Sequence, residues 1–455
     1  MARSVPPARA MKTILSIHIL WTLAAALIIL RQKRIPASAA AWIGIVALLP
    51  LLGTLFYILA GFRRRAPAPD TVVGLRDPLA RLIALNCGSH PTPYNRVKLL
   101  HNGNNAFSAL IASLQRATRS IHMEYYIIRD DRIGQTIAEI LIRKARAGLE
   151  VRVIYDAVGS WHLSRATLSR MHQAGVQTAA FEPVRFPWFT PRTNRRNHRK
   201  IVVTDGKVAY LGGINIAKYY LDGDYLGKWR DEHLRLEGDI VADLQRLFIA
   251  DWARCRGEVL DIRRHTAAHD IRQRLAIQLA WAQEGASRLT LAEAFAAAIT
   301  RSRETVRVSS PYFMPPTLLL DALRLAAHSG VRVQVMIPTN SDSAFTDLIS
   351  DSYVEDLLEA GVELYRYENG FLHAKLLIVD GHTASVGTAN MDYRSLLDNL
   401  EVTAFIYDQK VSKDLAATFD EDLHQCLRVD PAQWQQRPMW RRTLGDVLRL
   451  AAPLM

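Results

Sequence analysis

The sequence is poor in cysteine and has no low-complexity segment. Its 455 residues include only Cys87, Cys255 and Cys426, an odd number of thiols at wide spacings. This pattern matches neither the disulfide framework of a small secreted domain nor the paired ligands of a zinc site. The chain is also too long for one ordinary hydrophobic core. We therefore expect several structural units, with the soluble part in a reducing compartment.

Acidic residues are outnumbered. The chain has 57 Lys and Arg against 44 Asp and Glu, which gives a net charge of +13 and a pI of about 9.7. Such an excess indicates an anionic partner, either nucleic acid or an acidic membrane surface. Charge alone does not choose between these two partners.

Two stretches near the N-terminus contain no Asp, Glu, Lys or Arg: residues 14–30 and 37–61. Both approach the length that a bilayer requires, so we predict a transmembrane helical hairpin joined by RQKRIP. A cleaved signal peptide is disfavoured because the first run exceeds the ~7–15 apolar residues of such a segment. A buried core hairpin is disfavoured because soluble helices keep a polar face.

The basic residues around this hairpin predict its orientation. More of them flank the two spans than lie in the loop, and two spans leave both flanks on one side of the membrane. The flanks contain Arg3, Arg9, Lys12, Arg63, Arg64, Arg65 and Arg76, and the loop contains Arg31, Lys33 and Arg34. We therefore expect the bulk of the chain on the cytoplasmic side.

The rest of the sequence alternates β-type runs with helical periods, and then does so again. A strand from Ser120, a helix at 132–147 and a strand from Val151 have counterparts in a strand from Thr305, a helix through Ala327 and a strand from Val331. Internal duplication of an α/β unit is the simplest explanation.

The expected divisions are a transmembrane hairpin at 1–62, a juxtamembrane linker at 63–100, a first repeat at 101–262, a charged, helix-prone connecting segment at 263–288, a second repeat at 289–428 and an amphipathic tail at 429–455. The tail mixes Trp434 and Trp440 with arginines and leucines. It suits a helix in the membrane interface or a helix packed on the domain, and the sequence leaves both open.

A nine-residue stretch recurs in the two repeats. HRKIVVTDG at 198–206 and HAKLLIVDG at 373–381 both continue into the full pattern His-x-Lys-x4-Asp-x6-Gly-x-x-Asn, which ends at Asn215 and Asn390. A lone strand histidine is usually packed or solvated, but two complete copies of this pattern favour a functional site.

Strand geometry suggests different roles within the stretch. Residues two apart share a face of a strand, so His198 lies with Lys200, and His373 with Lys375. The aspartates, Asp205 and Asp380, have the opposite parity and precede glycine. Asp-Gly between two β-type runs is a hairpin signal, so we expect them to support the turn.

These groups suit attack on a phosphodiester. One imidazole can act as nucleophile or base while the other acts as acid, and the lysines and asparagines can stabilise the phosphoryl oxygens. Near the motifs there is no carboxylate cluster for a metal pair, so we expect no metal and no cofactor. Asp231 and Glu401, each after a repeat's hairpin, are candidates for orienting the histidines.

These motifs resemble the phospholipase D superfamily, whose mark is the duplicated His-x-Lys-x4-Asp motif. Together with PLLGTLFYILAG, WRDEHLRLEG and the terminal PLM, the chain is similar to bacterial cardiolipin synthases. The resemblance implies two α/β sandwich repeats facing each other across one active site. It also implies a multi-pass protein of the bacterial cytoplasmic membrane.

The resemblance further implies transfer of a phosphatidyl group between two phosphatidylglycerol molecules through a phosphatidyl-histidine. His198 would be the nucleophile and His373 the acid and base, and Asp231 and Glu401 would orient them. Anionic membrane lipids would be the partners, and no nucleic acid is expected. The identity of the acceptor lipid and the oligomeric state are not readable from the sequence.

Two further features bear on this expectation. Gly213 stands where many superfamily members have Ser, whereas the second repeat has Thr388, so a hydroxyl contact is in question in the first repeat only. The loop RFPWFTPRTNRRNHRK from Arg185 mixes aromatic residues with Arg195 and Arg196. Such a loop suits either an acidic headgroup or plain solvent.

Other activities remain open. A hydrolase would use water as acceptor and release phosphatidic acid. A nuclease of the same superfamily would also suit a basic surface, although it needs no membrane anchor. A non-catalytic membrane scaffold is disfavoured, because a relic would be expected to lose a motif histidine or lysine.

Overall fold

The structure is a computed structural model that describes residues 7–31, 36–58, 75–184, 195–282, 290–450 and 452. The chain divides into two compact units, an N-terminal one that covers residues 1–67 with 184–195, and a larger one that holds most of the remainder.

The N-terminal unit contains helices α1 (Pro7–Arg31), α2 (Pro36–Leu48) and α3 (Pro50–Phe56). Within the described residues, one helix is long and apolar enough to cross a membrane, at Lys12–Arg31. The second predicted span is interrupted at Leu49, which has φ −132° and ψ 73°. A residue that precedes proline is disfavoured in the helical region, and Pro50 follows. The structure therefore supports the hairpin prediction only in its first arm.

The larger unit is built on one sheet of 15 strands. In sheet order the strands are β19 (Cys426–Arg428), β13 (Glu363–Tyr367), β12 (Arg332–Pro338), β10 (Thr305–Ser309), β15 (Leu376–Val379), β16 (Thr383–Gly387), β18 (Val402–Tyr407), β9 (Arg274–Trp281), β1 (Thr92–His101), β8 (Glu232–Gly238), β6 (Val208–Gly212), β5 (Ile201–Thr204), β2 (Ser120–Tyr125), β3 (Glu150–Asp156) and β4 (Gln177–Phe181).

The order of the strands confirms the predicted duplication. Outward from the antiparallel β1–β9 pair, one half runs β8, β6, β5, β2, β3, β4, and the other half runs β18, β16, β15, β10, β12, β13. In both halves the last three of these six strands are parallel to one another, and β19 adds an antiparallel edge strand beyond β13. The two halves are therefore copies of one α/β unit, joined within the sheet by the β1–β9 pair.

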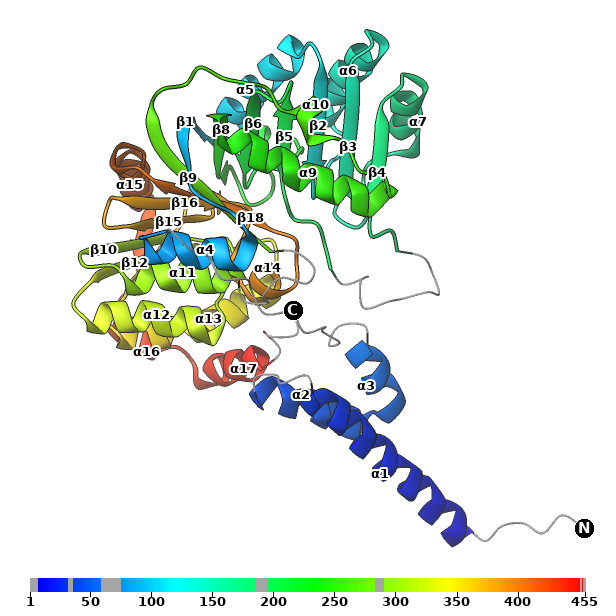
Figure 1. Cartoon of the computed structure of the whole chain (residues 1–455). Helices are drawn as coiled ribbons and strands as arrows, with labels where there is room; N and C mark the ends of the chain where they lie inside the picture. The colour runs from blue at the N-terminus through cyan, green and yellow to red at the C-terminus, as the bar shows by residue number, and fades with distance from the viewer. Residues whose placement is uncertain are drawn as a thin grey trace, which may run out of the picture. The chain divides into compact units, whose positions relative to one another are not determined.

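Helices cover the faces of both half-sheets (Figure 1). The first half carries α5 (Asn102–Arg116), α6 (Arg132–Arg146), α7 (Arg165–Gln173) and α9 (Ile240–Arg256), and the second carries α11 (Thr290–Thr300), α12 (Thr317–His328), α13 (Ala344–Glu359) and α15 (Gln409–Leu423). The other helices of this unit are α4 (Pro78–Cys87), α8 (Tyr219–Asp222), α10 (Ile262–His265), α14 (Tyr393–Leu397), α16 (Pro431–Gln435) and α17 (Met439–Arg449).

Each half has its own apolar core, and a third core is shared. Strand residues such as Val203 and Leu211 from the first half, and Ile378 and Val386 from the second, belong to the same buried cluster, together with residues of α9 and α15. This shared core holds the two repeats face to face as a sandwich.

Two segments predicted as linkers contain β1 and β9, the two strands that join the halves of the sheet. Strand β9 lies within the segment at 263–288 that was predicted to be helix-prone, and β1 lies largely within the predicted linker at 63–100. The charges around β9, such as Arg272 and Arg274, obscured a run in which Leu275, Ile277 and Leu279 are buried. The helical prediction for this segment was wrong, because pairing with β1 and β18 outweighs local propensity.

The predicted motif hairpins are confirmed as the antiparallel pairs β5–β6 and β15–β16. At the first turn Asp205 has φ 56° and Gly206 has φ 66°, the two positive values of a type I′ turn. The Asp205 carboxylate accepts backbone N–H bonds from Thr118 at 2.9 Å, Arg119 at 2.7 Å and Ser120 at 3.0 Å. The motif aspartate thus ties its turn to the start of β2.

The second hairpin repeats this arrangement. Asp380 has φ 51° and Gly381 has φ 62°. The Asp380 carboxylate accepts backbone N–H bonds from Arg303 at 2.9 Å, Glu304 at 2.8 Å and Thr305 at 2.9 Å, at the start of β10. Both aspartates therefore brace the sheet at its turn.

Substitution of Asp205 by alanine should destabilise the fold more than it harms the chemistry. Several charge-assisted bonds are lost and a Cβ residue is left at positive φ, so we expect a loss of about 2 kcal/mol in unfolding free energy. Asp205→Asn, which keeps an acceptor and tolerates this backbone, should lose less. Denaturant unfolding in detergent measures the difference.

The same comparison has a pH signature. Burial opposes ionisation of Asp205, but the backbone bonds from Arg119, Thr118 and Ser120 hold its pKa below the ordinary 3.8. Its ionised form is therefore favoured in the fold. The stability difference between the protein and Asp205→Asn should be full above about pH 4 and shrink as pH falls further. A constant difference down to pH 3 would contradict this account.

Candidate active site

A cavity of about 720 Å³ lies between the two repeats of the larger unit, and residues of both motifs line it. The motif residues on its wall are His198, Asn215, His373 and Asn390. The structure therefore brings together two histidines that lie far apart in the sequence.

The motif histidines and lysines lie in extended segments before the strands, not within them. Strand β5 begins at Ile201 and β15 begins at Leu376. The expectation that His198 and Lys200 lie on a strand was wrong by a few residues. The reason is that each motif segment leaves its own sheet to pair with the other repeat.

This pairing has the same register in both directions. Asn197 forms a parallel bridge with Leu400, and the N–H of His198 donates to the Leu400 carbonyl at 3.0 Å. In the other direction, β14 (Phe371–Leu372) pairs in parallel with β7 (Trp229–Arg230), and the N–H of His373 donates to the Arg230 carbonyl at 2.7 Å.

The register places each histidine beside a carboxylate of the opposite repeat. Nδ1 of His198 lies 2.9 Å and 3.0 Å from the two carboxylate oxygens of Glu401. Nδ1 of His373 lies 2.7 Å from Oδ2 of Asp231. A carboxylate partner makes Nδ1 the donor and leaves Nε2 of each ring for chemistry.

Burial and neighbouring charges keep the histidines neutral. Burial lowers the pKa of His198 to about 4, against the opposing effect of Glu401. Burial, together with the charges of Lys375 and Lys200, lowers the pKa of His373 well below 6.5. A neutral imidazole is the form that a nucleophile or a general base requires.

The lysines carry charge into this buried site. Nζ of Lys200 donates to the His198 carbonyl at 2.7 Å, and Nζ of Lys375 lies 2.9 Å from Nδ1 of His373. Burial lowers the pKa of Lys200 to about 7 and that of Lys375 to about 8. An arriving phosphate anion would reverse these shifts, because an opposite charge stabilises the ammonium form.

The asparagines differ between the repeats. The amide oxygen of Asn215 accepts from the N–H of Ile127 at 3.2 Å, and its Nδ2 donates to the Tyr220 hydroxyl at 3.2 Å. The amide oxygen of Asn390 is buried and has no hydrogen-bond partner within the described residues. Both amides lie on the cavity wall.

The position of Gly213 explains the missing hydroxyl of the first repeat. A Cβ on Gly213 would lie 2.2 Å from Oδ1 of Asp231, so a serine would displace the carboxylate. In the second repeat the hydroxyl of Thr388 donates to Glu401 and accepts from the N–H of Val402 at 3.0 Å. In the first repeat the shorter side chain of Asp231 thus lies against Gly213, and in the second repeat the longer side chain of Glu401 is held by Thr388.

Several residues of the site were not predicted from the sequence, because they have no counterpart in the other repeat. Aromatic rings enclose the histidines: Tyr126 packs edge-on to His198 at 4.8 Å between ring centroids, and Trp229 lies 5.1 Å from His373. The Tyr220 hydroxyl lies 3.2 Å from Nδ1 of His373. The cationic side chains on the cavity wall are Arg129, Lys218 and Arg394.

The loop predicted to hold a headgroup falls outside the described residues over 185–194. At its end, Arg196 is buried, and its guanidinium pairs with Asp156 at 3.4 Å. Asp156 also accepts the N–H of Asn197 at 2.9 Å. Arg196 therefore anchors the motif segment and is exposed neither to a headgroup nor to solvent, the two surroundings considered for the loop.

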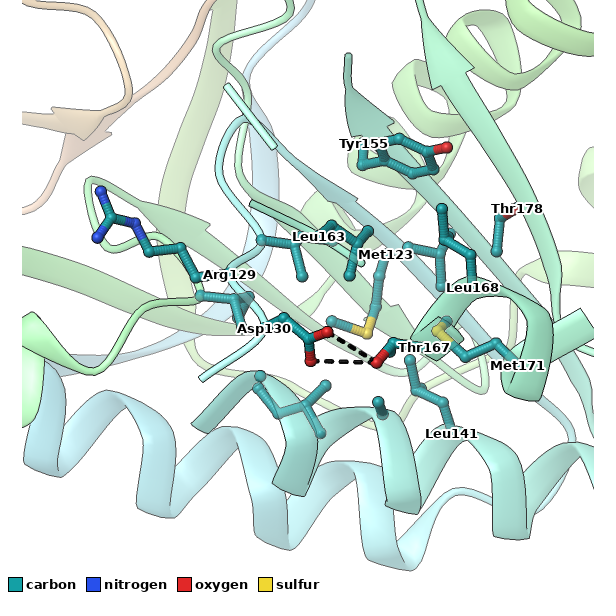
Figure 2. Close-up of a pocket in the computed structure, with 16 residues that line it drawn as sticks. Met123, Arg129, Asp130, Leu141, Tyr155, Leu163, Thr167, Leu168, Met171 and Thr178 are labelled. Atoms are coloured by element: carbon teal, nitrogen blue, oxygen red, sulfur yellow. Dashed lines mark hydrogen bonds between the residues drawn. The ribbon is translucent and has the colours of Figure 1, made fainter. Parts of the chain in front are cut away.

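A second, much smaller cavity of about 20 Å³ lies in the first repeat, among β2, β3, α6 and α7 (Figure 2). Its wall is largely aliphatic. The Asp130 carboxylate accepts from the Thr167 hydroxyl at 3.0 Å and 3.1 Å, so these polar groups satisfy each other. We interpret it as a packing void, and the larger cavity as the reaction site.

One cluster of metal-ligand type occurs in the described part of the chain, near the start of β3. Nε2 of His122 and of His265 lie 3.1 Å and 3.6 Å from Oε1 of Glu150. The guanidinium of Arg152 pairs with the same carboxylate oxygen and already supplies a cation there. The cluster is therefore a buried polar network rather than a candidate metal centre.

Comparison with known proteins assigns these features to a family. The family model described as "Cardiolipin synthase, PLD-like domain" matches residues 110–252 and 295–423, one segment in each repeat. A second model, described as "Phospholipase_D-nuclease N-terminal", matches residues 19–61.

Curated relatives match almost the whole length. The chain is 39% identical to the cardiolipin synthase of Geobacillus kaustophilus over 94% of this chain and 91% of that one. It is 36% identical to cardiolipin synthase 2 of Bacillus anthracis over 94% and 89% of the two chains.

Solved structures share the fold. Phosphatidylserine synthase of Haemophilus influenzae superimposes with a TM-score of 0.60 at 13% identity, over 80% of this chain and 97% of that one. Polyphosphate kinase of Porphyromonas gingivalis gives a TM-score of 0.52 at 14% identity, over 74% of this chain and 49% of that one.

Proposed function

The chain belongs to the cardiolipin synthase family of phospholipase D-like proteins, and from this premise we propose that it joins two phosphatidylglycerol molecules into cardiolipin and glycerol. The observation that carries the proposal is the crossed pair of histidine–carboxylate contacts in one cavity. Two oriented imidazoles in one site are what a two-step transfer through a covalent intermediate requires.

In the first step, Nε2 of His198 attacks the phosphorus of one phosphatidylglycerol. The bond from phosphorus to the glycerol headgroup oxygen breaks, and His373 gives that oxygen a proton. The anionic phosphate raises the pKa of His373 from its low value, so the imidazole can carry this proton. Glycerol leaves, and the phosphatidyl group stays on His198.

In the second step, neutral His373 takes the proton from a headgroup hydroxyl of another phosphatidylglycerol. The hydroxyl oxygen attacks phosphorus, the phosphorus–nitrogen bond to His198 breaks, and cardiolipin forms. Lys200 and Lys375 stabilise the charge on the phosphoryl oxygens in both steps. The additional cations Arg129, Lys218 and Arg394 suit the phosphate of the acceptor lipid.

The N-terminal unit suits this substrate. Helix α1 has the length and composition of a membrane span, and the adjoining α2 and α3 are apolar. We propose that residues 14–61 form a hairpin that anchors the enzyme in the bacterial cytoplasmic membrane, with the larger unit in the cytoplasm. Reagents that label lysines from one side of sealed vesicles would test this sidedness.

Lipid analysis tests the activity. Purified protein in phosphatidylglycerol vesicles should yield cardiolipin and glycerol in equal amounts, and neither should form with His198→Ala. Phosphatidic acid as the main product would replace the proposal with hydrolysis. DNA cleavage without any lipid turnover would replace it with a nuclease. Adding phosphatidylethanolamine shows which lipid serves as acceptor.

The lysine pKa values predict the pH dependence. Because Lys200 and Lys375 have pKa values of about 7 and about 8, raising pH through this window removes charges that bind phosphate. We expect kcat/KM, which reports the free enzyme, to fall above about pH 7–8. It should also fall near pH 4, where His198 becomes protonated.

A substitution identifies the alkaline limb. Lys200→Arg places a guanidinium, which stays charged, at this position. The variant should be slower overall, and the part of the decline caused by Lys200 should move above pH 9. A kcat/KM that stays level to pH 9.5 in the unmodified protein would contradict this assignment.

A further inference from the structure

Helix α17 turns its apolar face to solvent. Met439 is 80% exposed and Val447 is 57% exposed, and Trp440, Leu444 and Leu450 are also exposed. At 3.6 residues per turn these positions fall on one side of the helix. An exposed stripe of this kind indicates a surface that meets another apolar phase.

The opposite, polar side of α17 is the one that packs on the protein. Gly445 is buried, and a Cβ there would lie 3.2 Å from the carbonyl oxygen of Leu348 on α13. Ion pairs join Arg442 to Glu355 at 2.5 Å, and Arg449 to Asp356 at 2.6 Å. A helix on a soluble domain normally buries its apolar face, so α17 has the inverse arrangement.

The helix leads directly to the reaction cavity. Ala452, two residues beyond the capping residue Leu450, is buried and lines the cavity that holds the motif histidines. Tyr225 lines the same cavity and is 81% exposed, so it stands at the opening. Exposed Phe345 lies between two cavity-lining residues at the start of α13. Exposed apolar groups therefore lie both on α17 and beside the cavity.

We propose that α17 is a docking surface for the headgroup layer of an anionic lipid bilayer. Its apolar stripe enters the interface beside the cavity opening. An exposed cation borders the stripe, since the Arg441 guanidinium lies 5.3 Å from the Trp440 ring centroid. Tryptophan and arginine beside aliphatic residues are typical of helices that lie in an anionic interface.

A second protein copy is the weaker candidate for this surface. A stable dimer buries about 800 Å² on each partner, and one face of an 11-residue helix offers less than that. A bilayer is also expected for this chain, because α1 has the length and composition of a membrane span. The inference rests on the proposed lipid substrate and adds how that substrate arrives: docking lets headgroups enter the cavity without leaving the membrane.

Placing negative charges in the apolar stripe tests the docking. The variant combines Trp440→Glu with Val447→Glu in the full chain, and Val259→Glu is the matched control. Val259 is 80% exposed, and it follows Glu258, which bonds to Trp252 at 2.9 Å and pairs with Arg152 near the start of β3. Val259 therefore lies near the start of β3, whereas Asp156 at the other end of β3 contacts the first motif segment. The control thus changes an exposed apolar residue that is far from the reaction cavity.

Two substrates separate docking from chemistry. On phosphatidylglycerol vesicles with the protein reconstituted, the double variant should lose at least tenfold in kcat/KM, and Val259→Glu should lose none. On short-chain phosphatidylglycerol below its micelle concentration, all three proteins should turn over equally. An equal loss on both substrates would make α17 a structural helix and overturn the proposal, as would full activity on vesicles.

A depth measurement keeps the proposal independent of activity. Lipids brominated near the headgroup should quench more fluorescence in the unmodified protein than in Trp440→Phe. Equal quenching would overturn the docking, and so would a change in oligomeric state in the double variant, which would show that a second copy covers the stripe. If the unmodified protein made no cardiolipin, the proposed function would fail, and quenching alone would decide the docking.

Discussion

Replacement of His373 by alanine should slow cardiolipin formation by roughly 10²–10⁴ while leaving the nucleophile able to react with an activated substrate. In the proposed mechanism His373 protonates the departing glycerol oxygen and later deprotonates the acceptor hydroxyl. A leaving group that departs as a stable anion needs no such proton. With nitrophenol in place of the glycerol headgroup, the first step of the His373→Ala variant should therefore be as fast as that of the unmodified protein.

The experiment uses phosphatidyl-nitrophenol with an isotope in the phosphatidyl group. The His373→Ala variant should release a burst of about one nitrophenolate per enzyme and retain the label on a peptide that contains His198. The His198→Ala variant should show neither burst nor label. A label on the His198→Ala protein and none on the other variant would exchange the two roles.

The same hairpin provides a matched control. His382 follows the Asp380–Gly381 turn and is exposed, so it shares the local backbone of the second motif but not the cavity. His382→Ala should form cardiolipin at the unmodified rate. If it lost activity to the same degree as His373→Ala, the hairpin's integrity rather than the imidazole would explain both results.

The sequence predicts this site well where the information is local and duplicated. The histidines, lysines and asparagines of both motifs were identified because one spacing occurs twice, and the Asp-Gly turns follow from the backbone preferences of two residues. The succession of strands and helices along each repeat follows from periodicity for the same reason. Each of these features depends on neighbours only a few residues away.

Features that depend on tertiary pairing were not predictable. Strand β9 appeared helical because its charged neighbours hide a core that exists only once β1 and β18 flank it. Tyr220 and Trp229 contact His373 without any repeat partner to mark them. The burial of Arg196 was not predicted either, because its partner Asp156 lies far away in the sequence, at the end of β3.

The crossing of the carboxylates leads to the second large effect. Glu401 lies in the second repeat and contacts His198 of the first, whereas Asp231 lies in the first and contacts His373 of the second. If each carboxylate orients the histidine that it contacts, its loss should reproduce the defect of that histidine rather than of its own repeat. If each carboxylate instead stabilised its own repeat, its loss should reproduce the defect of the histidine in that same repeat.

Glu401→Gln should therefore lower the rate by roughly 10²–10⁴ on both phosphatidylglycerol and the nitrophenyl substrate, because the nucleophile is misoriented in either reaction. Asp231→Asn should lower the rate on phosphatidylglycerol to a similar degree yet leave the nitrophenolate burst intact. Rates of the burst and of cardiolipin formation in the two isosteric variants make this comparison directly.

Double variants decide whether the contacts act as units. Groups that work through one another are strongly non-additive, so Glu401→Gln should add little to His198→Ala, and Asp231→Asn should add little to His373→Ala. The unlike combinations, Glu401→Gln with His373→Ala and Asp231→Asn with His198→Ala, then serve as controls.

If Glu401→Gln spared the burst while Asp231→Asn abolished it, the carboxylates would act within their own repeats. The pairing of Asn197 with Leu400 and of Arg230 with Leu372 would then join the repeats without setting their chemistry.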